Sequence, residues 1–239
     1  MRIVLVCIAK NEEKYIQEWI DYHFKLGFDS IYIYENDWKS NIVQDNVTTI
    51  SFNGRAKQMP AYNHFIEIYS DFYDWICFLD VDEFIVLKKH NNIKEFITDY
   101  KKYNAIGINW VLFGDNNLKS VVNDNYNVLE RFTKCELNHN VHIKSIVKSS
   151  KNVKMVTPHN CQATTISTCY TNFSGPYLNN CNTDVAQINH YFCKTYEEFL
   201  LKVARGRSDI GTIRNLTDFA DHNKNEVEDL TALNFFKAK

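Results

Sequence analysis

Acidic side chains occupy three of four consecutive positions at Asp80, Asp82 and Glu83. They follow an apolar run, residues 75–79, that has the composition of a buried strand. Side chains alternate between the two faces of a strand, so Asp80 and Asp82 project to the same side if the extended backbone continues. Two carboxylates that face one point repel each other unless a positive charge lies between them. Mg²⁺ or Mn²⁺ suits this place, because one or two carboxylates and substrate phosphates commonly bind such ions. The alternative is a solvated acidic turn.

The elements that must position these carboxylates alternate between strand and helix in the first half of the chain. Apolar runs predict strands over residues 3–9, 30–34, 47–52 and 75–79. The helical spacing of apolar residues predicts helices over 16–26, 60–69 and 93–103. This alternation is typical of an α/β fold with a central, mostly parallel sheet flanked by helices.

The second half of the chain has shorter patterned segments. Apolar pieces predict strands over residues 105–113, 129–132, 142–148, 153–156 and 187–192. Thr195 and Glu198 form a capping box that begins a helix through residue 204, which Gly206 ends. A last helix is predicted over 226–236, and residues 158–184 are predicted to form long loops.

Composition excludes several classes of protein. A length of 239 residues suits one main domain. The formal net charge of −2, with both signs interspersed, gives no field that would attract nucleic acid. Seven cysteines without a Cys-x-x-Cys pair argue against a disulfide framework and a zinc site.

Hydropathy bears on localisation. No apolar run approaches the roughly 20 residues that a membrane span needs. The first ten residues are predicted to form a strand and not a signal peptide. We therefore expect a cytoplasmic protein, with peripheral membrane contact left open.

Polar residues follow four of the predicted strands, at residues 10–12, 35–37, 80–83 and 114–116. In open α/β sheets, ligands bind beyond the carboxyl ends of the strands, so this topology brings the four segments to one rim. The convergence indicates a site, although strand ends that face solvent are polar in any case.

The sequence lacks the glycine-rich loops that commonly bind phosphate. It has neither a Gly-x-x-x-x-Gly-Lys-Ser/Thr loop nor a Gly-x-Gly-x-x-Gly loop after the first strand. A metal ion and scattered cations would then hold a diphosphate, and the candidate cations are Arg55, Lys57, Lys202, Arg205 and Arg207. His190 is either a buried core histidine or a third metal ligand, with His142 and His159 as weaker candidates for that place.

Five motifs occur in order along the chain: Lys10-Asn11-Glu12, Ile33-Tyr34-Glu35-Asn36, Phe78-Leu79-Asp80-Val81-Asp82-Glu83-Phe84, Asn109-Trp110-x-x-Phe113-Gly114, and His190-Tyr191-Phe192 with Lys194. Together they resemble the signatures of a glycosyltransferase with the A-type fold, in the family 2-like and family 92-like group. The resemblance implies one nucleotide-diphospho-sugar transferase domain over residues 1–206. Residues 1–103 would bind the nucleotide sugar, residues 104–206 the acceptor, and residues 207–239 would form a helical, polar extension.

The same resemblance implies partners and residue roles. The donor would be a nucleotide sugar, UDP-linked, with Mn²⁺ or Mg²⁺ as cofactor, and the acceptor a saccharide or a lipid-linked glycan of polysaccharide biosynthesis. The implied donor-binding residues are Ala9, Asn11, Glu12, Asn36, Asp37, Lys57, Gln58, Asp80 and Lys202. The implied metal ligands are Asp80, Asp82 and His190, and the implied acceptor residues are Trp110, Phe113 and Gly114.

An inverting transfer, which the family 2-like pattern favours, also needs a carboxylate that deprotonates the acceptor hydroxyl. Asp115 is the first candidate because it follows a strand at the active rim, and Glu83 and Asp184 come next. Three other functions stay open at this point: a sugar nucleotidyltransferase, a non-catalytic carbohydrate- or nucleotide-binding domain, and a phosphohydrolase.

Overall fold

Strand β1 (Ile3–Ala9) is buried along its whole length and lies inside the central sheet. Its alternating side chains divide the core in two. Ile3, Leu5 and Cys7 pack with α1 (Ile16–Leu26) on one face. Val4, Val6 and Ile8 pack with α2 (Gln58–Tyr69) on the other face. The computed structural model describes residues 1–138, 140–162, 182–207, 209–210, 212 and 214–238.

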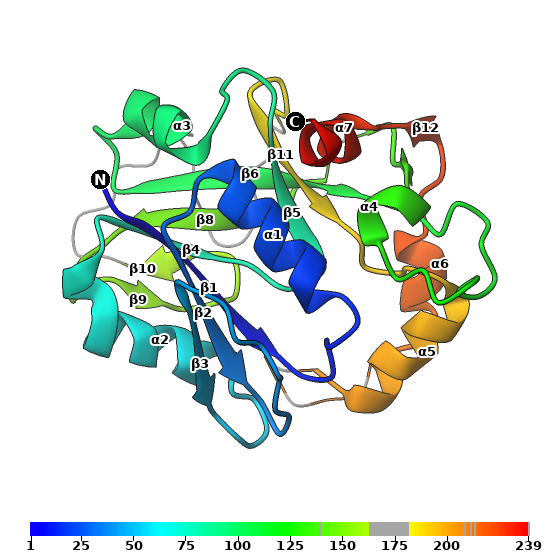
Figure 1. Cartoon of the computed structure of the whole chain (residues 1–239), viewed down its shortest axis with the longest axis horizontal. Helices are drawn as coiled ribbons and strands as arrows, with labels where there is room; N and C mark the ends of the chain where they lie inside the picture. Colours follow the sequence, from blue (N-terminus) through cyan, green and yellow to red (C-terminus); the bar gives the residue numbers. More distant parts are fainter. Residues whose placement is uncertain (139, 163–181, 208, 211, 213, 239) are drawn as a thin grey trace.

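The central sheet has eight strands in the order β3-β2-β1-β4-β8-β6-β11-β5 (Figure 1). The remaining strands are β2 (Ser30–Glu35), β3 (Val47–Ser51), β4 (Trp75–Phe78), β5 (Glu83–Leu87), β6 (Ala105–Leu112), β8 (Ile143–Lys148) and β11 (Ala186–His190). Neighbours from β3 to β4 are parallel, and β11 is parallel to β6. Strand β8 is antiparallel to both β4 and β6, and β5 is antiparallel to β11. The predicted α/β fold with a mostly parallel, mixed sheet is confirmed.

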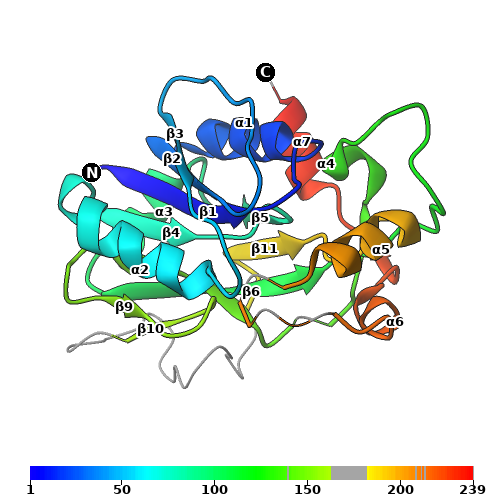
Figure 2. The ribbon, with the colours of Figure 1, turned by 90° about the horizontal axis from the view of Figure 1, so that it is seen from below.

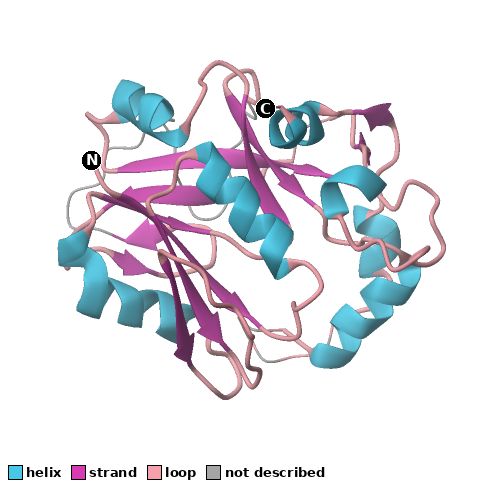
Figure 3. Cartoon of the chain, in the orientation of Figure 1, coloured by secondary structure: helices cyan, strands magenta, loops and turns pink. Residues whose placement is uncertain are grey.

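Helices cover both faces of this sheet. Helices α1 and α7 (Thr231–Lys237) lie on one face and α2 on the opposite face (Figure 2). The other helical segments are η1 (Ser70–Phe72), α3 (Ile93–Tyr100), α4 (Val128–Arg131), α5 (Tyr196–Arg205) and α6 (Asp218–His222), arranged around the strands in Figure 3. Two small sheets pair β9 (Lys154–Met155) with β10 (Cys161–Gln162) and β7 (Lys134–Cys135) with β12 (Val227–Glu228). Among the described residues, no helix has the length and apolarity needed to cross a bilayer.

The predicted helix ends follow local signals. Gly27 ends α1 with φ 104°, in the left-handed conformation that glycine adopts without steric cost. Thr195 and Glu198 form the predicted capping box at the start of α5. These signals lie within a few residues of the helix they control, so the sequence alone reveals them.

Two local predictions are wrong, and contacts between distant parts of the chain explain them. Residues 129–132 were expected to form a strand, but they overlap α4, whose first N–H groups donate to the Glu18 carboxylate. The predicted helix over 226–236 divides into β12, which pairs with β7, and α7. Strand β5 and helix α6 were not predicted. Of the predicted loop over 158–184, residues 163–181 lie outside the described residues.

The backbone after β4 is a turn, in contrast to the extended geometry expected for Asp80 and Asp82. The N–H of Glu83 donates to the carbonyl of Asp80 at 3.1 Å. The chain then continues as β5, whose backbone oxygen at Glu83 accepts the indole N–H of Trp19 at 2.9 Å. Both aspartates therefore face one side of the molecule through a turn and not through strand alternation.

Gly114 lies where the C-terminal part of the chain crosses the end of β6. A Cβ at this position would overlap the backbone oxygen of Lys224 and the side-chain amide of Asn225. The neighbouring N–H groups of Asp115 and Asn116 donate to Asn223 and Asn225, each at 2.8 Å. The close backbone approach requires glycine here.

We therefore expect Gly114→Ala to lower the free energy of unfolding by roughly 1–3 kcal/mol, because the added methyl overpacks a buried contact. Urea denaturation measures the change. The exposed Lys119, a few residues along the same loop, supplies the control: Lys119→Ala should change stability by no more than about 0.5 kcal/mol. Equal stabilities of the two variants would contradict the close approach.

Candidate active site

A cavity of about 1000 Å³ opens at the carboxyl ends of β1, β2 and β4. Side chains from several elements line it, including the turn after β4, β6, β11 and the chain after α5. Of the residues predicted to form the site, it brings together Ala9, Glu12, Asn36, Asp37, Gln58, Asp80, Asp82, Trp110, His190 and Lys202. Three of the four predicted strand ends, at residues 10–12, 35–37 and 80–83, therefore meet at one concavity, and residues 114–116 do not line it.

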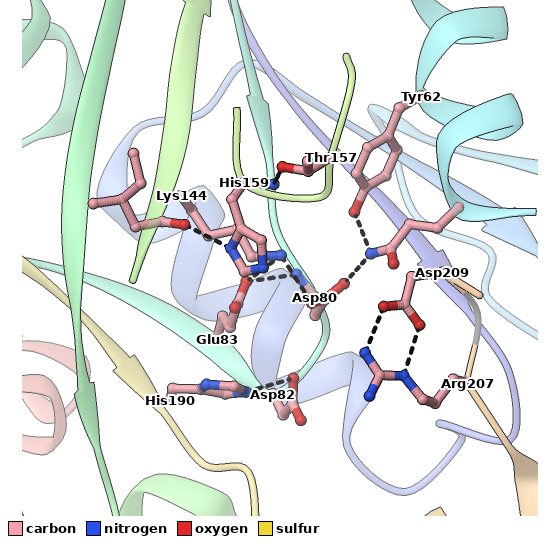
Figure 4. Close-up of polar contacts among 12 residues, drawn as sticks. Tyr62, Asp80, Asp82, Glu83, Lys144, Thr157, His159, His190, Arg207 and Asp209 are labelled. Atoms are coloured by element: carbon pink, nitrogen blue, oxygen red, sulfur yellow. Dashed lines mark hydrogen bonds and ion pairs between the residues drawn. The ribbon is translucent and has the colours of Figure 1, made fainter. Parts of the chain in front are cut away.

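Asp80 is held by two donors from different elements. Its Oδ1 accepts from Gln58 Nε2 at 2.6 Å, and its Oδ2 accepts from Lys144 Nζ at 2.8 Å (Figure 4). Burial alone would raise the pKa of the Asp80 carboxyl, but the Lys144 ammonium outweighs it and holds the pKa below its ordinary value. Asp80 is thus an anion whose two oxygens are already engaged.

Glu83 lies beneath this pair and is fully buried. Its Oε2 accepts from the N–H of Asp80 at 2.9 Å and lies 3.2 Å from Lys144 Nζ. Burial raises the pKa of Glu83 to about 8, although Lys144 opposes the shift. Lys144, 1% exposed on β8, therefore ties both carboxylates of the turn to the sheet.

Asp82 faces the cavity from the other end of the turn. Its Oδ2 accepts from Lys202 Nζ at 2.5 Å, and its Oδ1 lies 3.7 Å from Nε2 of His190. Burial would raise the pKa of Asp82, but the Lys202 ammonium outweighs it and holds the pKa well below the ordinary value. Burial lowers the pKa of His190 to about 4, so its imidazole is neutral at physiological pH.

Asp82 and His190 form the part of the predicted metal site that fits a cation. A carboxylate oxygen and a neutral imidazole nitrogen suit Mn²⁺, and their 3.7 Å separation exceeds a hydrogen bond. Asp80 is committed to Lys144 and Gln58. No group of three or more metal-ligating His, Cys, Asp or Glu side chains occurs in the part of the chain that the structure describes. Substrate oxygens and water would have to complete the coordination.

An aromatic wall lies beside these groups. Trp110 stacks on His142 with ring centroids 5.0 Å apart, and its centroid lies 4.2 Å from that of His190 and 5.1 Å from that of His159. All four residues line the cavity. Aromatic faces of this kind suit contact with the apolar face of a sugar ring.

The structure places six other predicted residues away from the cavity lining: Asn11, Lys57, Glu83, Phe113, Gly114 and Asp115. Phe113 is fully buried and packs on Tyr191, so it offers no surface to an acceptor. Asp115 Oδ1 accepts from the N–H of Asn117 at 2.8 Å and from Asn225 at 3.1 Å. Glu83 and Asp115, the predicted catalytic carboxylates, therefore do not line this cavity.

Two cationic residues of the site, Lys144 and Arg214, were not predicted from the sequence. Lys144 interrupts an otherwise apolar strand, which is the signal that could have revealed a buried charge with a partner. Arg214 lines the cavity from a weakly patterned segment in which no local signal marks it.

The family model described as Glycosyltransferase family 92 matches residues 2–203. The chain belongs to glycosyltransferase family 92. A family 92 protein of Oryza sativa is 24% identical over 112 residues, covering 43% of this chain and 19% of that protein. A family 92 protein of Arabidopsis thaliana is 25% identical over 114 residues, covering 41% of this chain and 20% of that protein. The matched part thus spans about a fifth of the length of these curated relatives.

Solved structures resemble this chain more distantly. Residues 1–349 of TarS from S. aureus are 15% identical, with a TM-score of 0.41, and the match covers 86% of this chain and 65% of that one. A UDP-glucose pyrophosphorylase in complex with UDP-glucose is 12% identical, with a TM-score of 0.34. The match covers 99% of this chain and 96% of that one.

We expect Lys144→Met to lower the free energy of unfolding by about 1–3 kcal/mol, because it leaves the partly buried Asp80 carboxylate without its cation. Adding Asp80→Asn in the same chain should restore part of the loss, since the uncompensated charge is then replaced by a neutral amide. Thermal and urea unfolding measure both variants.

Lys148→Met, at the exposed end of the same strand, is the matched control and should be nearly neutral. A Lys144→Met protein as stable as the Lys148→Met protein would show that the buried cluster does not hold the turn.

Proposed function

We propose that this protein is a metal-dependent glycosyltransferase that moves a hexose from a UDP-sugar to a saccharide or lipid-linked glycan acceptor. The observation that carries the proposal is the Asp82–His190 pair, which lies in the cavity beside the Trp110 wall at the carboxyl ends of the strands. Membership of family 92 supports transfer of a sugar over the nucleotidyltransferase, phosphohydrolase and binding-domain alternatives.

The nucleoside would lie at the ends of β1 and β2. Ala9, Glu12, Asn36 and Asp37 line this part of the cavity. Asn36 donates to the carbonyls of Phe52 and Gly54 at 3.0 and 2.8 Å, and thereby fixes the backbone that borders it. A rigid, polar border of this kind supports recognition of a base and ribose.

Asp82 and His190 would hold the Mn²⁺ or Mg²⁺ ion. Lys202 fixes the second oxygen of Asp82 at 2.5 Å, so Oδ1 stays directed toward His190. A bound ion would stabilise the negative charge that develops on the departing phosphate oxygen. Lys144 and Gln58 keep Asp80 ionised beside it.

In the transfer, the acceptor hydroxyl oxygen bonds to the anomeric carbon while the bond from that carbon to the phosphate oxygen breaks. The electron pair leaves with UDP, and the hydroxyl proton passes to a basic atom of the cavity or to water. The Trp110 wall would orient a sugar ring for this step. Inversion at the anomeric carbon stays a prediction from the family resemblance.

The test is release of UDP from a panel of UDP-sugars with Mn²⁺, with and without saccharide acceptors. We expect Asp82→Asn and His190→Ala each to lower the rate about 100-fold or more, because the charge on the leaving group loses its stabilisation. Removing metal with EDTA should abolish release, and Mn²⁺ should restore it.

Asp115→Asn is the informative comparison, because its carboxylate lies outside the cavity lining and an amide oxygen keeps the same acceptor role. We expect its rate to stay within about twofold of the unmodified protein, since it removes no group that contacts substrate. Full activity of Asp82→Asn, or loss of activity in Asp115→Asn alone, would overturn this assignment of the site.

A further inference from the structure

The segment from residue 204 onward lies beyond residues 2–203, which the family model matches, yet it lines the cavity. It contributes three arginines, Arg205, Arg207 and Arg214. Two of them are neutralised: Arg205 pairs with Glu12, and Arg207 pairs with Asp209 at 2.7 Å. Each therefore has its charge balanced within the protein.

Arg214 differs from the other two. Its Nε is buried without a hydrogen-bond partner among the described residues, and it forms no ion pair with a carboxylate among them. Asp218, which also lines the cavity, uses its Oδ2 to accept from the N–H of Asn215 at 3.2 Å. Burial lowers the pKa of Arg214, which reports a guanidinium that has lost water.

The Arg214 guanidinium lies close to the Phe192 ring. The Cζ of Arg214 lies 5.1 Å from the ring centroid, and the Nζ of Lys202 lies 3.9 Å from the same centroid. His222 stacks on the ring with centroids 4.2 Å apart. Two cations thus share one aromatic ring, and Lys202 is already paired with Asp82.

This part of the cavity consequently holds a guanidinium that makes no ion pair with a described carboxylate. A partly desolvated guanidinium without an acid partner is unfavourable unless an anion joins it. Guanidinium groups bind phosphate through two parallel N–H donors, which an ammonium group cannot do. The guanidinium shares the Phe192 ring with Lys202, which pairs with Asp82, and the proposed transfer releases a nucleoside diphosphate at Asp82.

We infer that Arg214 binds a phosphate group of the nucleoside diphosphate, both in the sugar donor and in the departing product. The inference rests on the proposed function and adds a substrate-binding residue from outside the family-matched segment. Arg214 supplies a fixed positive charge, while Lys202 orients Asp82. Phe192 holds both cations in place from one side.

Isothermal titration calorimetry with UDP and with uridine, each with Mn²⁺, tests this role. We expect Arg214→Gln to weaken UDP binding about 10- to 100-fold, as loss of a charge-assisted hydrogen-bonded contact predicts, and to leave uridine binding unchanged. Arg214→Lys should give an intermediate affinity, because it keeps the charge without the fork. The exposed Arg2, outside the cavity, gives the matched control Arg2→Gln, which should bind both ligands as the unmodified protein does.

Different results would overturn the role of Arg214 and the proposed function. If Arg214→Gln binds UDP as tightly as the unmodified protein, or loses uridine and UDP equally, Arg214 is not a phosphate ligand and the proposed function still stands. If the unmodified protein binds no nucleoside diphosphate, the proposed function fails together with the inference.

Discussion

The geometry of the site depends on one buried interaction, the contact of the Lys144 ammonium with Asp80 and Glu83. These charges lie at the point where the chain leaves β4, turns, and returns as β5. Lys144 comes from β8, which is antiparallel to β4 and inserted between β4 and β6. The cation therefore joins the parallel half of the sheet to the mixed half, and it fixes the turn from which Asp82 faces the cavity.

The charged side chains of the cavity fall into two groups, those paired within the protein and those available to a ligand. Lys144 and Gln58 engage Asp80, so this carboxylate supports the turn. Asp82 gives one oxygen to Lys202 and directs the other to a neutral imidazole, which leaves a place for a cation. Arg214 leaves a place for an anion. The proposed metal ion and diphosphate would bring charges of opposite sign to these two places.

Sequence reasoning found the parts of the fold and site that depend on neighbouring residues. The buried run of β1, the glycine that ends α1 and the capping box of α5 are all local, because backbone conformation and burial pattern repeat over a few positions. The convergence of strand ends followed from the topology that alternating elements impose. Asp82 was identified in this way, His190 was a candidate metal ligand, and the glycosyltransferase resemblance implied Trp110; all three line the same cavity.

The parts of the fold and site that were not predicted depend on contacts between residues far apart in the chain. Residues 129–132 have a strand-like composition, yet the Glu18 carboxylate caps a helix there. Phe113 and Asp115 follow a strand that ends at the rim, but the C-terminal part of the chain packs over them, and Gly114 permits its approach. Sequence alone thus determined the strands of the parallel part of the sheet and where most of their polar ends collect. Only the tertiary structure decided which of those polar groups are neutralised by a partner and which face a ligand, because burial and charge pairing are properties of the folded chain.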